Sequence, residues 1–177
     1  IEGYQRAWTD ALLYEERWLY EAYNKGLSLL PTSELPWYRV RWERALERHS
    51  DGTFVDHAEL VEELLDRIRR DGPLSSTDVE PRAAIDWYWR PTNQVRAILE
   101  ALAESGILGI VRREGNQRVY DLIERLVPPE LLEHRESEDD ALRHRLLSRY
   151  RAVGLLAGQA AADVIYSTGS VADRTRW

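Results

Sequence analysis

The sequence contains no cysteine, and this absence excludes several kinds of site. Without thiols there is no disulfide framework, no thiolate zinc site and no cysteine nucleophile. Methionine is also absent, which favours the interpretation that the chain is a piece of a longer protein. No apolar run approaches the roughly 18 residues of a membrane span, and residues 1–10 lack the basic start and apolar core of a signal peptide. We therefore expect a cytoplasmic protein with no membrane partner.

Lysine is nearly absent as well, because 23 of the 24 basic residues are arginine and the single lysine is Lys25. Acidic residues number 31, so the formal net charge is −7. A chain with this charge does not coat nucleic acid indiscriminately. Any binding to DNA must therefore depend on where individual arginines lie, and five of them fall within Trp87–Asp121.

Hydrophobic periodicity predicts a mainly α-helical protein with small β-hairpins. A short helix is expected before Pro81, because Ser75-Ser-Thr-Asp78 offers an N-cap. Alternation predicts two strands, Leu108–Arg112 and Gln117–Leu122, joined by a turn. The longer helices are expected over Tyr4–Lys25, Pro36–His49, His57–Arg70, Thr92–Ser105, Ser137–Ala152 and Leu156–Ile165.

The order helix, short helix, helix, hairpin is typical of a winged helix-turn-helix. We expect one complete winged-helix domain at residues 56–128. Residues 1–55 then form a helical region of a first winged-helix unit, and residues 129–177 begin a further, truncated unit. The expected fold class is therefore mainly α with small β-hairpins, arranged as tandem winged helices.

This domain organisation predicts which polar side chains meet DNA. In winged helices the third helix enters the major groove, and the hairpin suits contacts with phosphates or the minor groove. Arginine pairs with guanine edges or phosphates, and asparagine pairs with adenine. The alternative interpretation is that these residues are solvated charges on a module that packs or binds protein. The candidates are Arg90, Thr92, Asn93 and Arg96 at the helix start, and Arg112, Arg113, Asn116, Gln117 and Arg118 in the hairpin.

Aromatic residues form two groups. The run Trp87-Tyr-Trp89 can stack on an unpaired base, but we expect two of the three to cover the core. We expect the N-terminal set to serve mainly in packing between domains. Four scattered histidines give no convincing metal site, and no catalytic residue can be named from chemistry alone. The N-terminal set is Trp8, Trp18, Tyr20, Tyr23, Trp37, Tyr38 and Trp42.

Three sequence blocks resemble the YcaQ-like crosslink-repair DNA glycosylase family. They are Arg113-Glu-Gly-Asn-Gln-Arg-Val-Tyr-Asp-Leu122 with Glu124-Arg-Leu-Val-Pro128, the Trp87-Tyr-Trp89 run, and Tyr20-Glu-Ala-Tyr-Asn-Lys-Gly-Leu-Ser-Leu-Leu-Pro31. The resemblance implies tandem winged helices that bind damaged double-stranded DNA. It also implies hydrolysis, without metal or cofactor, of the N-glycosidic bond of alkylated purines, including purines in interstrand crosslinks.

The resemblance also implies where the catalytic residues lie. In the family, two glutamines that flank one apolar residue position the water, but the four glutamines here form no such pair. The motif is therefore expected before Ile1. Lys25 stands where many members have a histidine followed by Glu-Ala-Ser, and it can still contact phosphate or the lesion pocket. We expect a monomer; the alternatives are a winged-helix transcriptional regulator without catalysis and a module for protein contacts.

Overall fold

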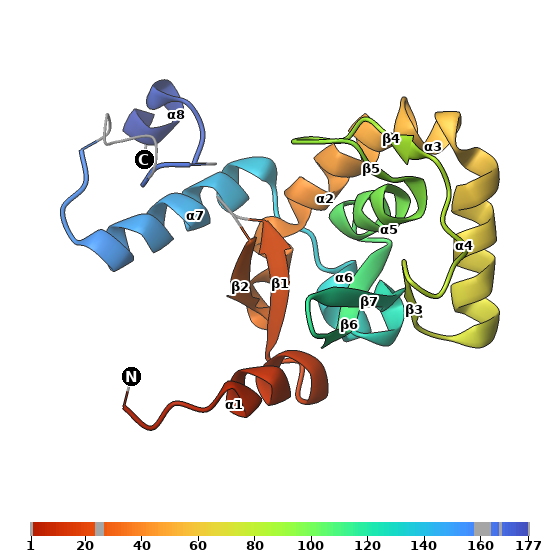
Figure 1. Cartoon of the computed structure of the whole chain (residues 1–177). Coiled ribbons are helices and arrows are strands. Elements are labelled where there is room, and N and C mark those ends of the chain that lie inside the picture. The colour runs from red at the N-terminus through yellow and green to blue at the C-terminus, as the bar shows by residue number, and fades with distance from the viewer. Residues whose placement is uncertain (1, 24–26, 158–163, 167, 177) are drawn as a thin grey trace.

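The computed structural model describes residues 2–23, 27–157, 164–166 and 168–176 (Figure 1). Helices dominate these residues, and the strands form three small antiparallel sheets. The expectation of a mainly α protein with small β-hairpins is confirmed. None of the helices in these ranges combines the length and the apolar content that a membrane span requires.

The N-terminal segment is not the single helix expected over Tyr4–Lys25. The helical turns end at Glu15, and the chain then enters a β-hairpin. Arg17 marks the change: its φ of 58° is left-handed, and its guanidinium donates to the carbonyl oxygens of Leu13 at 3.2 Å and Ile110 at 3.1 Å. A continuous helix would lose the bond to the distant strand. The elements are α1 (Arg6–Asp10), a π-helical turn η1 (Ala11–Glu15), β1 (Leu19–Tyr23) and β2 (Leu27–Pro31).

Helix α2 (Leu35–Ser50) confirms the helix expected over Pro36–His49. Proline fits the first turn, where its missing N–H would have no intrahelical partner. A 3-10 turn, η2 (Thr32–Glu34), precedes α2, and α3 (Thr53–Asp56) follows it. Trp42 of α2 lies against Gly106, where an added Cβ would overlap the indole ring. Glycine therefore permits the close approach of α2 to the end of the helix that precedes Gly106.

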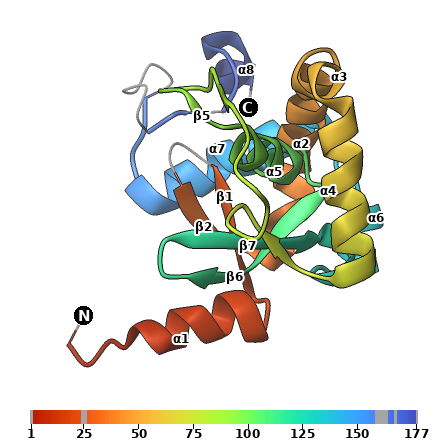
Figure 2. The ribbon, with the colours of Figure 1, turned by 45° about the vertical axis from the view of Figure 1, so that its right-hand side comes forward.

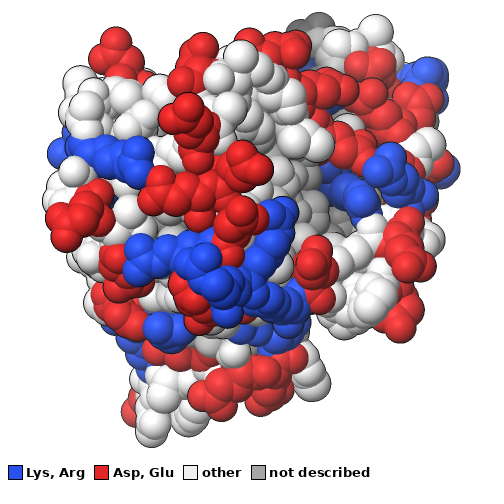
Figure 3. Space-filling view, turned by 90° about the vertical axis from the view of Figure 1, so that its right-hand side faces the viewer, with Lys and Arg blue, Asp and Glu red and all other residues white. Residues whose placement is uncertain are grey.

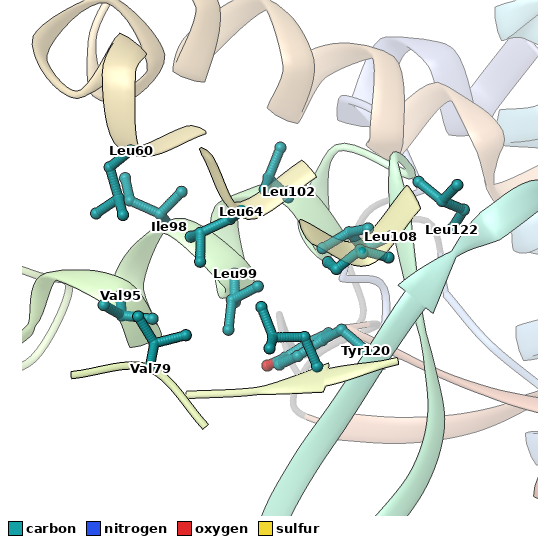
Figure 4. Packing of buried hydrophobic residues seen from close by; sticks show 12 residues of the cluster. Leu60, Leu64, Val79, Val95, Ile98, Leu99, Leu102, Leu108, Tyr120 and Leu122 are labelled. Carbon is teal, nitrogen blue, oxygen red and sulfur yellow. The ribbon is translucent and has the colours of Figure 1, made fainter. Parts of the chain in front are cut away.

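The main core lies between two helices and a three-stranded sheet (Figure 4). Leu64 and Ile68 of one helix and Ile98 and Leu99 of the other are fully buried. These positions confirm the apolar stripes and the strand pair expected from the sequence. The helices are α4 (Ala58–Asp71) and α5 (Gln94–Glu104), and the strands, in spatial order, are β3 (Leu74–Ser75), β7 (Gln117–Leu122) and β6 (Leu108–Glu114).

The short helix expected before Pro81 does not form. The backbone N–H of Ser75 donates to Oδ2 of Asp78 at 2.7 Å, which closes a tight turn. Val79 enters the core, and proline disfavours a helical conformation in the residue before it. The chain instead forms β4 (Ala84–Ile85) and β5 (Thr92–Asn93), which pair with each other and were not predicted.

The C-terminal part begins with η3 (Ile123–Arg125) and α6 (Pro129–Glu133). Helix α7 (Glu138–Val153) confirms the helix expected over Ser137–Ala152. It lies beside α2, where His144 stacks on the Trp37 ring at 4.3 Å and contacts the Glu34 carboxylate at 2.5 Å. Both ribbon views place the β1–β2 hairpin between α7 and the β6–β7 hairpin (Figures 1 and 2). The last helix is α8 (Val171–Arg176), and most of the helix expected over 156–165 falls outside the described residues.

Candidate nucleic-acid interface

The arginines of the β6–β7 hairpin do not all project into solvent. Arg113 forms an ion pair with Glu21 of β1, and Arg118 pairs with Glu100 of α5 at 3.1 Å. Only Arg112 is exposed, and it pairs with Glu114 at 2.8 Å on its own strand. Two of the three hairpin arginines that we expected to contact DNA are therefore paired with other elements of the chain. The β1–β2 hairpin supplies the partner of Arg113, and α5 supplies the partner of Arg118.

The pairing of Glu21 with Arg113 is a buried polar network. The Glu21 side chain is 3% exposed, and it accepts hydrogen bonds from Arg113 Nε at 2.8 Å and from the Tyr14 hydroxyl at 2.6 Å. Burial alone would raise the pKa of the Glu21 carboxyl, but the hydrogen bonds from Arg113 and Tyr14 outweigh it and hold the pKa below its ordinary value. Glu21 is therefore ionised, and its ion pair with Arg113 fixes the β6–β7 hairpin to β1.

Of the predicted DNA-binding residues at the start of α5, one caps the helix and two are exposed to solvent. Asn93 is the N-cap: its Oδ1 accepts from the N–H of Val95 at 2.9 Å, and its Nδ2 donates to the Arg82 carbonyl at 3.0 Å. This side chain supports the helix and is not free to pair with adenine. Arg90 and Arg96 are exposed, and Thr92 is half-buried.

The remaining predicted residues lie at the tip of the β6–β7 hairpin or outside the described ranges. Asn116 and Gln117 are exposed at the turn between the strands. Lys25 falls between β1 and β2 in the part of the chain that the structure does not describe. Arg112, Asn116 and Gln117 are therefore the exposed predicted residues of this hairpin, and the paired positions Arg113 and Arg118 lie between Arg112 and the tip.

A groove of about 590 Å³ lies between the β1–β2 hairpin, α2, α5 and α7. Its lining is rich in tyrosine and arginine, including Tyr20, Tyr38, Arg41 and Arg145. Tyr88 and Trp89 line it from the segment between β4 and β5. The sequence did not predict this groove, because it brings together elements from both ends of the chain.

The aromatic run between β4 and β5 is mostly outside the core. Trp87 is half-buried and donates its indole N–H to Glu100 at 3.1 Å. Tyr88 is 52% exposed and Trp89 is 94% exposed. The expectation that two of these rings cover the core is therefore wrong. The packing role expected for the N-terminal aromatic set is likewise wrong for its exposed members, Trp8, Trp18 and Tyr23, whereas Tyr38 is buried.

Tyr88 is held by a polar cluster at the rim of the groove. Its hydroxyl donates to Glu104 at 2.6 Å, and the same carboxylate accepts from Arg48 at 3.1 Å and contacts His49 at 3.2 Å. Burial alone would raise the pKa of the Glu104 carboxyl, but the hydrogen bonds from His49 and Tyr88 lower it overall. The ionised carboxylate therefore fixes Tyr88, while nothing comparable holds the neighbouring Trp89 indole, which extends into solvent.

Comparison of the sequence with known protein families identifies the family of this chain. The DNA glycosylase AlkZ-like family matches residues 1–177. The chain belongs to the AlkZ-like DNA glycosylase family. The resemblance seen in the sequence motifs is confirmed, and membership of this family indicates a DNA-repair glycosylase with DNA as its substrate. No solved structure matches the chain.

The surface of the AlkZ-like chain over α4 carries charges of both signs (Figure 3). Two arginines at the end of α4 are paired locally, Arg69 with Asp66 at 2.7 Å and Arg70 with Asp71 at 2.9 Å. Such a face has no strong field of one sign to attract a phosphate backbone. Among the described residues, no group of three or more histidines and carboxylates is placed to hold a metal ion. The groove and its aromatic rim are therefore the candidate interface.

Proposed function

We propose that this chain is the DNA-binding part of a glycosylase that hydrolyses the N-glycosidic bond of alkylated purines, including purines in interstrand crosslinks. The observation that carries the proposal is Trp89, whose indole is 94% exposed at the rim of a tyrosine- and arginine-lined groove. Glycosylases reach their target by taking a base out of the stack, which leaves unstacked bases that need an aromatic partner. An exposed indole beside a groove supplies that surface.

The elements around the core support a winged-helix assignment within this proposal. The order α4, α5, β6, β7, with β3 as a third strand, follows the winged-helix arrangement. The helix-turn-helix is modified, because the paired strands β4 and β5 replace its second helix. The winged helix would then present the start of α5 and the segment before it to the duplex.

Phosphate contacts in this proposal come from the exposed arginines. Arg90 and Arg96 flank the start of α5, and Arg112 lies near the tip of the β6–β7 hairpin with Asn116 and Gln117. Such contacts position a protein on a duplex without reading its sequence. A repair enzyme needs this kind of binding, because damage occurs in any sequence.

Hydrolysis of a glycosidic bond is compatible with a protein surface that mainly holds DNA in place. Alkylated purines that carry a positive charge are good leaving groups, so a positioned water and modest electrostatic help suffice. The glutamine pair that the resemblance implies is not among the four glutamines of this chain. The role we propose for these residues is therefore to hold damaged duplex DNA, as a monomer, with its target bond exposed.

Trp89→Ala tests the proposal. Stacking of a base on an aromatic ring contributes about 1–3 kcal/mol, so affinity for a duplex with an alkylated purine should fall by about 5- to 150-fold. The stability should change by less than about 0.5 kcal/mol, because the residue is exposed. Fluorescence anisotropy of labelled duplexes measures affinity, and urea unfolding measures stability.

Trp8→Ala is the matched control, because Trp8 is also an exposed tryptophan, 56% exposed, but lies on α1 away from the groove. It should leave DNA affinity unchanged. Equal losses in both variants, or no loss in Trp89→Ala, would refute a stacking role. Tight binding to one intact sequence, with no preference for alkylated duplex, would identify a transcriptional regulator instead.

A further inference from the structure

Two arginines of the groove have no acidic partner among the residues that the structure describes. Arg145 of α7 is 2% exposed, yet its Nη2 has no hydrogen-bond partner. Arg41 of α2 has a buried Nη1 in the same condition. No carboxylate among the described residues forms an ion pair with either side chain. Arginine stays protonated in proteins, so Arg145 is a buried charge and Arg41 a half-buried one, each with an unsatisfied N–H group.

A third unsatisfied donor lies in the same groove. The hydroxyl of Tyr20, on β1, is buried and has no hydrogen-bond partner. Aromatic rings flank both guanidinium groups: Arg145 Cζ is 6.0 Å from the Tyr38 ring centre, and Arg41 Cζ is 5.7 Å from the Tyr166 ring centre. Rings hold a guanidinium by its face and leave the N–H groups at its edge available.

The carboxylates that line the groove are already paired with other cations. Glu104 pairs with Arg48, and the remaining pairs are Glu21 with Arg113 and Glu100 with Arg118. Arg44 at the rim pairs with Glu138. Among the described residues, no acid therefore balances the positive charge of Arg41 and Arg145.

The electrostatics of Arg145 agree with an incomplete site. Burial, followed by the neighbouring charge of Arg41, lowers the pKa of Arg145 to about 10. Both effects disfavour the charged form, and the negative charge of a bound anion would oppose them. A residue kept only for folding would be expected to have an acid beside it, because unpaired buried charges destabilise a protein.

We infer that Arg145, Arg41 and Tyr20 form a binding site for a phosphate group. Guanidinium N–H and phenol O–H groups are the donors that phosphate oxygens accept, and the three donors come from separate elements, α7, α2 and β1, that meet at one groove. A DNA phosphodiester and a free phosphate ion share this chemistry. The assignment to the DNA backbone rests on the proposed function, whereas the anion site does not.

The first experiment measures thermal unfolding in inorganic phosphate and in chloride at equal ionic strength. Phosphate should raise the Tm of the wild-type chain, because a ligand of the native state stabilises it. Arg145→Met should lose this increment and keep, or raise, its Tm in chloride, because an uncompensated buried charge is removed. Tyr20→Phe removes one hydroxyl only and should reduce the increment.

Arg143→Met is the control, because Arg143 is an exposed arginine on the same helix, α7. It loses the same charge and should keep the full phosphate increment. A lower Tm for Arg145→Met in chloride, with the increment intact, would show a structural arginine and overturn the site. No increment in the wild type would overturn it as well.

The second experiment measures binding of a labelled DNA duplex over a range of salt concentrations. Arg145→Met and Arg41→Met should each weaken binding about tenfold and reduce the slope of log K against log salt by about 1. Arg143→Met should do neither. If the phosphate increment depends on Arg145 but DNA affinity does not, the assignment to the DNA backbone is wrong. If the wild-type chain binds no DNA, the proposed function fails, and the first experiment still decides the anion site.

Discussion

Glu21→Gln provides the sharpest test of how the β6–β7 hairpin is held to the N-terminal hairpin. The substitution removes one negative charge from a side chain that is 3% exposed and preserves its shape. Arg113, 22% exposed, then has no carboxylate, and the Tyr14 hydroxyl loses a charged acceptor.

The expected loss of stability follows from the burial of the pair. Removing one partner of a buried ion pair costs about 3–5 kcal/mol. Because about a fifth of Arg113 still meets solvent, we expect the lower end, about 3 kcal/mol. For a chain of this length each kcal/mol lowers Tm by about 2–4 °C, so Tm should fall by about 6–12 °C.

Urea unfolding followed by tryptophan fluorescence measures this loss, with a double-mutant cycle to isolate the pair. Arg113→Met alone also leaves a buried charge unpaired, whereas the double variant leaves none. The double variant should therefore be more stable than the sum of the single losses predicts, by about 1–3 kcal/mol. Additive losses would mean that the two side chains do not act together.

The same pair predicts a pH dependence. The pKa of the Glu21 carboxyl is lower in the folded chain than its ordinary value of about 4.3. Its stabilising contribution is therefore fully present above that value and is lost as the pH falls through the folded pKa. Glu21→Gln should flatten the acid limb of the stability curve. An unchanged stability and an unchanged acid limb would refute the reasoning.

Two further predictions concern single contacts. Asn93→Ala removes the N-cap of α5 and should lower the unfolding free energy by about 1 kcal/mol, measured by urea unfolding. Asn93→Asp, which keeps a capping oxygen, should lose less, and an equal loss would contradict capping. Gly106→Ala forces a side chain into the Trp42 ring at a φ of 68° and should cost about 1–3 kcal/mol. Gly115→Ala has a similar φ of 62° but open space, so it reports the backbone strain alone.

Much of the fold was predictable because its strongest signals are local. The stripes on α4 and α5 and the alternation of β6 and β7 are periodicities within single segments. The β1–β2 hairpin was missed because residues 19–23 show no alternation of burial and their apolar spacing also fits a helix. The short helix before Pro81 was wrong because a cap alone does not form a helix.

The candidate site was less predictable, because its contacts join distant segments. Glu21 and Arg113 are 92 residues apart, and no pattern within either segment indicates that they pair. The aromatic run at 87–89 was found, but adjacent large side chains do not indicate which of them is buried. The lack of an ion pair to Arg145 among the described residues depends on how the acids are placed in space, which the sequence does not reveal.

The contact of Trp42 with Gly106 has a consequence for how a ligand would be detected. This contact joins α2 to the end of α5 and hence to the main core, while α2 also packs against α7. Helix α2, which lines the groove, thus packs against elements on both sides of it. Occupancy of the groove would then be linked to unfolding of the core as well as to local motion, so a calorimeter should register it as a shift of the whole transition.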